Sequence, residues 1–227
     1  MDIKYTYYIV IAVALFFLQG ETIASKGKRP DLTKFIPAGY VIFDTVYGDI
    51  DKDGFEDCVI IIKGTDKKNI ITDESRGELD RNRRGILILL NKNAQYELAV
   101  KNYDCFSSEN EDGGVYFPPE LSINIRKGNL YVHYAHGRYG YWEYTFRYRD
   151  SDLELIGFDI GEARGPITIS QTSINYVTKK KVIETNIDPN AEDDAKEVFK
   201  KTVTRIKASK LLRLSTIKDF DELDLDE

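Results

Sequence analysis

Histidine, cysteine and tryptophan are scarce in this chain of 227 residues, which contains two, two and one of them. Two cysteines are too few for a domain held together by several disulfides, and a chain of this length can bury a core without them. The histidines, His133 and His136, are three residues apart, which places them on opposite faces of a continuing strand. We interpret both as structural, because a zinc site or a catalytic base needs partners that the sequence does not indicate.

An excess of basic residues is also missing. Lysine and arginine number 32 against 38 aspartates and glutamates, a formal net charge of −6 at pH 7. Such a chain has no broad attraction to phosphate backbones, so nucleic acid is not expected as a partner. Cys58 and Cys105 could pair in an oxidising compartment, but Cys58 lies in an apolar stretch where a buried thiol is equally expected. Their pairing stays open, as does the oligomeric state.

Long apolar runs are few, and the one near the N-terminus, residues 7–18, is shorter than the roughly 20 residues of a membrane-spanning helix. It follows Lys4 and precedes small residues ending at Ala24, which is the pattern of a secretory signal peptide. We therefore expect residues 1–24 to be a signal peptide and 25–39 a linker. The mature protein is expected to be periplasmic or secreted, without an integral membrane span; an uncleaved anchor is the alternative.

Carboxylates, in contrast, are concentrated in residues 48–57, which read GDIDKDGFED. Calcium loops take oxygen ligands from positions 1, 3, 5, 7 and 9 and have glycine at position 6, where a sharp turn is needed. Counted from the first aspartate, those five positions hold Asp49, Asp51, Asp53, Phe55 and Asp57. Phe55 would contribute its backbone carbonyl, and Gly54 stands at position 6. The pattern predicts a calcium site; the alternative is a metal-free acidic turn, because Asp and Gly are favoured in turns.

The segments on either side of this loop do not fit an EF-hand. Position 12 is Ile60 rather than an acid, and residues 40–47 and 58–63 are rich in β-branched and aromatic residues typical of strands. The DxDxDGxxD pattern between two strands resembles the calcium loops of FG-GAP and VCBS-type repeats, as in integrin α-chains. A weaker resemblance over much of 40–176 is to exported bacterial proteins with one such loop, and it rests on the stretches 84–87, 113–114, 144–148 and 155–157. The first resemblance implies a calcium ion in the loop, and the second implies a noncatalytic domain. Because no histidine or nucleophile lies nearby in the sequence, we expect the ion to be structural.

Alternating apolar segments predict a mainly β fold, a single antiparallel β-rich domain over residues 40–218. Two hairpins are expected, one pairing 85–90 with 96–100 and one pairing 121–125 with 130–134. The domain would be a sandwich, a partial barrel or a few propeller-like blades. A complete propeller is not expected, because such repeats would show several aspartate loops at a regular period.

Four aromatic residues alternate with polar residues over 142–148, namely Trp142, Tyr144, Phe146 and Tyr148. We interpret this aromatic face as part of the core, because aromatic residues usually bury their area. The alternative is an exposed platform for sugars or apolar peptides.

The remaining segments are predicted to be less regular. Residues 64–84 are expected to form a long exposed loop whose arginines, Arg81, Arg83 and Arg84, are solvated. Acidic residues near the start of 191–201 predict a short C-terminal helix there, and residues 219–227 are expected to be a frayed acidic tail.

These features favour a noncatalytic, exported calcium-binding domain that interacts with a protein or a glycan. One alternative is a periplasmic inhibitor or immunity protein whose charged loops block another protein. A hydrolase that uses the acids with His133 or His136 is the third hypothesis, and the sequence offers no positioned partner for either histidine.

Overall fold

The computed structural model describes residues 31–110, 120–190, 197–207, 210–223 and 225. The chain divides into two units, Met1–Leu32 and Thr33–Glu227. Only Asp31 and Leu32 of the first unit are described, so the predicted signal peptide lies outside the described residues. None of the helices in the described ranges has the length and apolar character that a membrane crossing requires.

The second unit is built almost entirely from antiparallel strands. Its strands are β1 (Tyr40–Gly48), β2 (Asp57–Gly64), β3 (Ile70–Asp73), β4 (Gly77–Asp80), β5 (Arg84–Lys92), β6 (Gln95–Phe106), β7 (Glu120–Arg126), β8 (Asn129–Ala135), β9 (Gly140–Arg149), β10 (Asp152–Arg164), β11 (Ile167–Asn175), β12 (Lys180–Asn186) and β13 (Phe199–Arg205). Short 3-10 turns are η1 (Thr33–Phe35), η2 (Lys67–Asn69), η3 (Gly137–Tyr139) and η4 (Leu214–Thr216). The predicted mainly β, antiparallel fold is confirmed.

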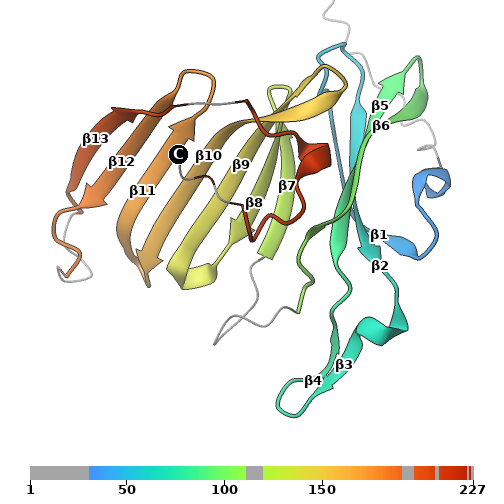
Figure 1. Ribbon diagram of the computed structural model, residues 1–227, viewed down its shortest axis with the longest axis horizontal. Helices are drawn as coiled ribbons and strands as arrows, with labels where there is room; N and C mark the ends of the chain where they lie inside the picture. Colours follow the sequence, from blue (N-terminus) through green and yellow to red (C-terminus); the bar gives the residue numbers. More distant parts are fainter. Residues whose placement is uncertain (1–30, 111–119, 191–196, 208–209, 224, 226–227) are drawn as a thin grey trace, which may run out of the picture. The chain divides into compact units, whose positions relative to one another are not determined.

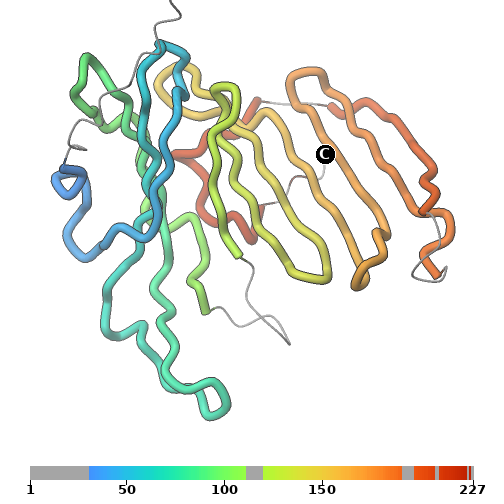
Figure 2. Tube along the Cα trace, turned by 180° about the vertical axis from the view of Figure 1, so that it is seen from behind, coloured from blue at the N-terminus to red at the C-terminus, as the bar shows by residue number. Residues whose placement is uncertain are grey.

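Three sheets result from the pairing of these strands (Figures 1 and 2). A four-stranded sheet has the order β1-β2-β5-β6, and a seven-stranded sheet has the order β13-β12-β11-β10-β9-β8-β7. β3 and β4 form a separate two-stranded ribbon. Both predicted hairpins are confirmed, as β5–β6 and β7–β8.

One hydrophobic core takes side chains from both larger sheets. The four-stranded sheet contributes residues such as Ile61 and Ile88, and the seven-stranded sheet contributes Val132, Tyr144 and Phe146. Trp142 and Tyr148 are partly buried and pack against this core. The interpretation of the 142–148 aromatic face as core is therefore confirmed.

The predicted exposed loop over 64–84 is wrong in part, because this stretch contains β3 and β4. Ile71 pairs with Leu79, whose side chain is buried, so the ribbon has an apolar contact that the surrounding charges hid in the sequence. Arg84 is also buried rather than solvated, and its guanidinium donates to the backbone carbonyls of Ser107 and Ser108.

The predicted helix over 191–201 is also wrong where the structure describes it. Residues from Phe199 onward belong to β13, which pairs along its whole length with β12 and forms one edge of the seven-stranded sheet. Alternating Thr202, Val203 and Thr204 favour a strand, and this preference outweighs the helix-start signal from the acidic residues. The only helical structure described after β13 is the η4 turn, and all of β13 is exposed.

After β13 the chain returns to the core through the C-terminal segment 210–225. The backbone N–H of Leu155 in β10 donates to the backbone carbonyl of Leu212. The N–H of Phe220 donates to the backbone carbonyl of Cys105 in β6. The Phe220 ring is buried and stacks on Phe106 with ring centroids 4.8 Å apart. Part of the segment expected to be a tail is thus packed between strands of the two sheets.

Cys58 in β2 and Cys105 in β6 are both buried, and no disulfide joins them. Burial raises the pKa of the Cys105 thiol far above its ordinary value. The structure therefore resolves the open pairing in favour of two buried thiols.

Candidate metal centre

The aspartate loop joins β1 to β2, and strand pairing closes it at its base, where Gly48 pairs with Asp57. Gly48 also lies against β7, since a Cβ added there would come within 2.8 Å of the Ile125 side chain. Glycine at this position lets the base of the loop approach the seven-stranded sheet. Within the loop, Gly54 has a φ of 90°, the left-handed value expected at its position.

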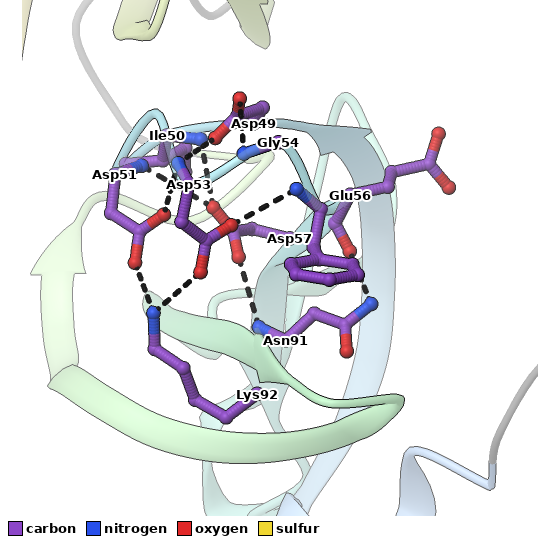
Figure 3. A network of polar contacts seen from close by, with 10 residues as sticks. Asp49, Ile50, Asp51, Asp53, Gly54, Glu56, Asp57, Asn91 and Lys92 are labelled. Atoms are coloured by element: carbon purple, nitrogen blue, oxygen red, sulfur yellow. Dashed lines mark hydrogen bonds and ion pairs between the residues drawn. The ribbon is translucent and has the colours of Figure 1, made fainter.

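The Asp57 carboxylate is a hydrogen-bond acceptor for the backbone of the loop and of β5 (Figure 3). Its side chain is fully buried, and its two carboxylate oxygens accept three backbone N–H groups. Oδ2 accepts from Ile50 at 2.7 Å and from Asp51 at 3.4 Å, and Oδ1 accepts from Asn91 at 2.9 Å. Because Asn91 belongs to β5, this carboxylate ties the loop to the neighbouring strand as well as folding it back on itself.

The other three aspartates accept hydrogen bonds from the loop's own backbone. Asp49 accepts from the N–H groups of Asp53 and Gly54, both at 3.1 Å. Asp51 accepts from Asp53 at 3.2 Å, and Asp53 accepts from Phe55 at 2.9 Å. Such local bonds are how aspartate forms turns without any metal.

Lys92, the last residue of β5, belongs to the site, and the sequence analysis missed it. Its ammonium group contacts Asp51 Oδ2, and it lies 2.7 Å from Asp53 Oδ2 (Figure 3). The signal for it is the register between β2 and β5, in which Cys58 pairs with Leu89. This pairing puts the end of β5 beside the loop, but it becomes visible only when the two strands are known to be neighbours.

Three of the predicted ligands converge. Carboxylate oxygens of Asp49, Asp51 and Asp57 lie within 4.8 Å of one another. Two oxygens bound to one calcium ion, each at about 2.3–2.6 Å, can be at most about 5 Å apart, so this spacing fits a single ion. A donor set made only of oxygens suits hard cations such as calcium and magnesium.

Asp53 and Phe55 complete the predicted ligand set but lie outside this group. Asp53 directs Oδ2 to Lys92, and Phe55 is exposed with its N–H donating to Asp53. The structure thus brings together three of the five predicted ligand residues and pairs a fourth with a lysine.

Neighbouring charges, hydrogen bonds and burial shift the pKa values of the ionisable groups in the loop. The hydrogen bond from Lys92 holds the pKa of Asp53 below its ordinary value, and the Phe55 N–H acts in the same direction. Asp51 and Asp53 together raise the pKa of Lys92. Burial raises the pKa of Asp57, an effect that the N–H groups of Asn91 and Ile50 partly offset. Lys92 therefore remains charged and acts as an internal counter-cation for the loop.

The histidines do not belong to this acidic group. His133 Nδ1 lies 3.4 Å from Glu143 Oε2, and its ring stacks on Tyr141. His136 packs against Trp142, with ring centroids 4.4 Å apart, and burial lowers its pKa. Successive residues of β9 point to opposite faces, so the two histidines contact opposite faces of the sheet.

Comparisons of the chain with protein-family models, with curated proteins and with solved structures found no match.

Proposed function

We propose that the protein is a noncatalytic, exported domain that binds one calcium ion in the β1–β2 loop and interacts with a protein or glycan partner. The convergence of oxygens from Asp49, Asp51 and Asp57 is the observation that carries the metal part of this proposal. Export rests on the sequence pattern of residues 1–24.

Calcium fits the proposal better than magnesium. Calcium accepts six to eight oxygens in a flexible shell, whereas magnesium demands near-ideal octahedral geometry and keeps several of its waters. The loop offers carboxylates of several orientations, with Lys92 balancing part of their charge. In the proposal, calcium displaces this lysine, and Asp53 and the Phe55 carbonyl then join the ligand set.

The role of the ion is structural. Asp57 already closes the loop through backbone N–H groups, so a cation bound beside it would add to an existing turn. A divalent charge also reverses the repulsion among neighbouring carboxylates, each pair of which costs about 1 kcal/mol at 4 Å in water.

Thermal and chemical unfolding of the mature protein with calcium and with a chelator tests the metal part. Extracellular calcium modules bind with dissociation constants of about 10⁻⁴–10⁻³ M, so 10 mM calcium is expected to raise the free energy of unfolding by about 1.4–2.7 kcal/mol. The double variant Asp49→Asn/Asp51→Asn is expected to lose this gain, whereas Glu97→Gln, an exposed acid on β6, keeps it. Equal stability with calcium and with chelator, together with no metal in elemental analysis, would contradict calcium binding.

Replacing Lys92 with methionine is expected to strengthen calcium binding about three- to tenfold, because the ammonium group competes for Asp51 and Asp53. Without calcium the same variant is expected to be less stable, since the loop loses its counter-cation. Isothermal titration measures the first effect and urea unfolding in chelator the second. Lys67→Met, beyond the other end of β2, is the control and should change neither; an unaltered affinity in Lys92→Met would show that the lysine does not compete.

Binding assays on a glycan array and pull-downs from envelope extracts address the partner. Each is run with calcium and with chelator, and a partner of the calcium-loaded domain is retained only in the first condition.

A further inference from the structure

The inner face of the seven-stranded sheet contains a hollow of about 310 Å³ beside the C-terminal segment. Its lining comes from β9, β10, β11 and β12 and from the C-terminal residues Phe220, Asp221, Leu223 and Leu225. The aspartate loop contributes nothing to this lining, so the hollow is independent of the proposed calcium site.

The register of the strands places mainly apolar side chains on the part of the sheet that lines the hollow, which we call its floor. Phe158 pairs with Tyr144 on one side and with Ile174 on the other, and Ile160 pairs with Trp142 and Thr172 in the same way. Paired residues in a sheet point to the same face, so all six side chains are presented together. Three strands, β9, β10 and β11, thus supply three aromatic and two aliphatic side chains, with Thr172 as the polar member, to one surface.

The C-terminal segment forms the wall. Phe220 is fixed at its base, because its N–H donates to Cys105 and its carbonyl accepts from the Tyr144 hydroxyl at 3.2 Å. Leu223 and Leu225 follow along the hollow and are partly buried against the core. Residues of this segment and of the sheet together line the hollow.

Polar groups lie only at part of the lining. Thr172 and Lys181 come from β11 and β12, and Asp221 comes from the wall. An apolar floor with a few convergent polar groups is the usual composition of a small-molecule site, and such sites have volumes of about 300–1,000 Å³.

We propose that this hollow, which we call the inner pocket, binds a small amphipathic molecule with a short apolar body and one polar head group. The body lies on the aromatic and aliphatic floor, and the head group lies near Thr172, Lys181 and Asp221. The volume is at the lower end of the range for ligand sites, which favours a medium-length alkyl chain or a single aromatic system over a larger lipid.

Fluorescence titration tests this proposal directly, because Trp142 is the only tryptophan in the chain and lines the inner pocket. The probes are decanoate and decan-1-ol, each kept monomeric, with acetate as a head group that lacks the apolar body. We expect a saturable change of Trp142 emission with at least one decyl probe and none with acetate. A lack of saturable change with both decyl probes would overturn the proposal.

Two variants on neighbouring residues of β11 locate the binding. Thr172→Phe fills the pocket and is expected to weaken binding at least about tenfold, whereas Gln171→Phe, which places the same ring on the opposite face, should alter affinity less than about twofold. Equal affinities in these two variants would place the probe elsewhere and refute the inner pocket as its site.

A third variant keeps the test decisive if Thr172→Phe does not fold. Leu223→Ala/Leu225→Ala removes the apolar part of the wall and leaves the floor intact. It is expected to weaken binding of the decyl probe about fivefold, because the probe regains contact with water on one side. Unchanged affinity would exclude the C-terminal segment as a wall of the site.

Discussion

Replacing Asp57 with alanine is expected to lower the free energy of unfolding by about 3–5 kcal/mol, even in the presence of chelator. The fully buried carboxylate accepts N–H groups from Ile50, Asp51 and Asn91, and hydrogen bonds to a charged group stabilise by about 1.5–3 kcal/mol each. Alanine leaves the donors without an acceptor, and Ile50 and Asn91 remain near their places because the Ile50 side chain is buried in the core and Asn91 belongs to β5. Urea unfolding followed by Trp142 fluorescence measures the loss.

Asp53→Ala is the matched control, because Asp53 belongs to the same loop but is exposed, and it accepts hydrogen bonds from the loop's own Phe55 N–H and from Lys92. It is expected to cost less than about 1 kcal/mol, as for other exposed ion pairs. Similar losses in the two variants would mean that Asp57 is no more important to the loop than its exposed neighbours.

Replacing Phe220 with alanine is expected to cost about 3–5 kcal/mol of unfolding free energy, the range for removing a large aromatic side chain from a core. Its ring stacks on Phe106 of β6 and makes an edge contact with Tyr144 of β9, so one side chain fills space between strands of the two sheets. The variant also loosens the start of the inner pocket's wall. Urea unfolding in chelator measures the cost.

Phe199→Ala provides the comparison for this variant, because it removes the same ring from an exposed position on the edge strand β13. A loss below about 1 kcal/mol is expected there, within the usual range of surface substitutions. If Phe220→Ala cost no more than Phe199→Ala, the C-terminal segment would contribute little to the stability of the domain.

Much of the fold could be predicted from local patterns. Alternation over 121–125 and 130–134 places Ile123, Leu130 and Val132 on one face, and it specifies the β7–β8 hairpin because the intervening turn is short. The same reasoning assigned Tyr144 and Phe146 to the core. Local alternation is sufficient for hairpins, since both partners and the turn lie within one short stretch of chain.

Contacts between distant segments could not be predicted in this way. β2 pairs with β5 although the β3–β4 ribbon lies between them in the sequence. Nothing in either strand specifies the register that brings Asn91 and Lys92 to the aspartate loop. The C-terminal residues read as an acidic tail, because their charges outnumber the apolar side chains. Phe220 is nevertheless buried, since four aromatic rings from other elements surround it.

Those residues of the candidate site that are close together in the chain could be predicted from the sequence. Spacing alone selected five residues, and the loop gathers oxygens of three of them, Asp49, Asp51 and Asp57, but not of Asp53 and Phe55. Spacing cannot show which carboxylate faces a basic residue from another strand, and this is why the contact of Asp53 with Lys92 emerged only from the structure. A local motif can indicate its own ligand residues, but it does not indicate which basic residue from another strand pairs with them.

Two copies of β13 that met edge to edge would bring the basic side chains of one strand, which include Lys200 and Arg205, close to those of the other. Like charges placed opposite one another oppose strand pairing, and lysine at an exposed edge is a common protection against aggregation. This protection weakens as added salt shortens the Debye length from about 10 Å at 0.1 M to about 3 Å at 1 M. Concentrated stocks of the protein therefore stay dispersed best at low ionic strength.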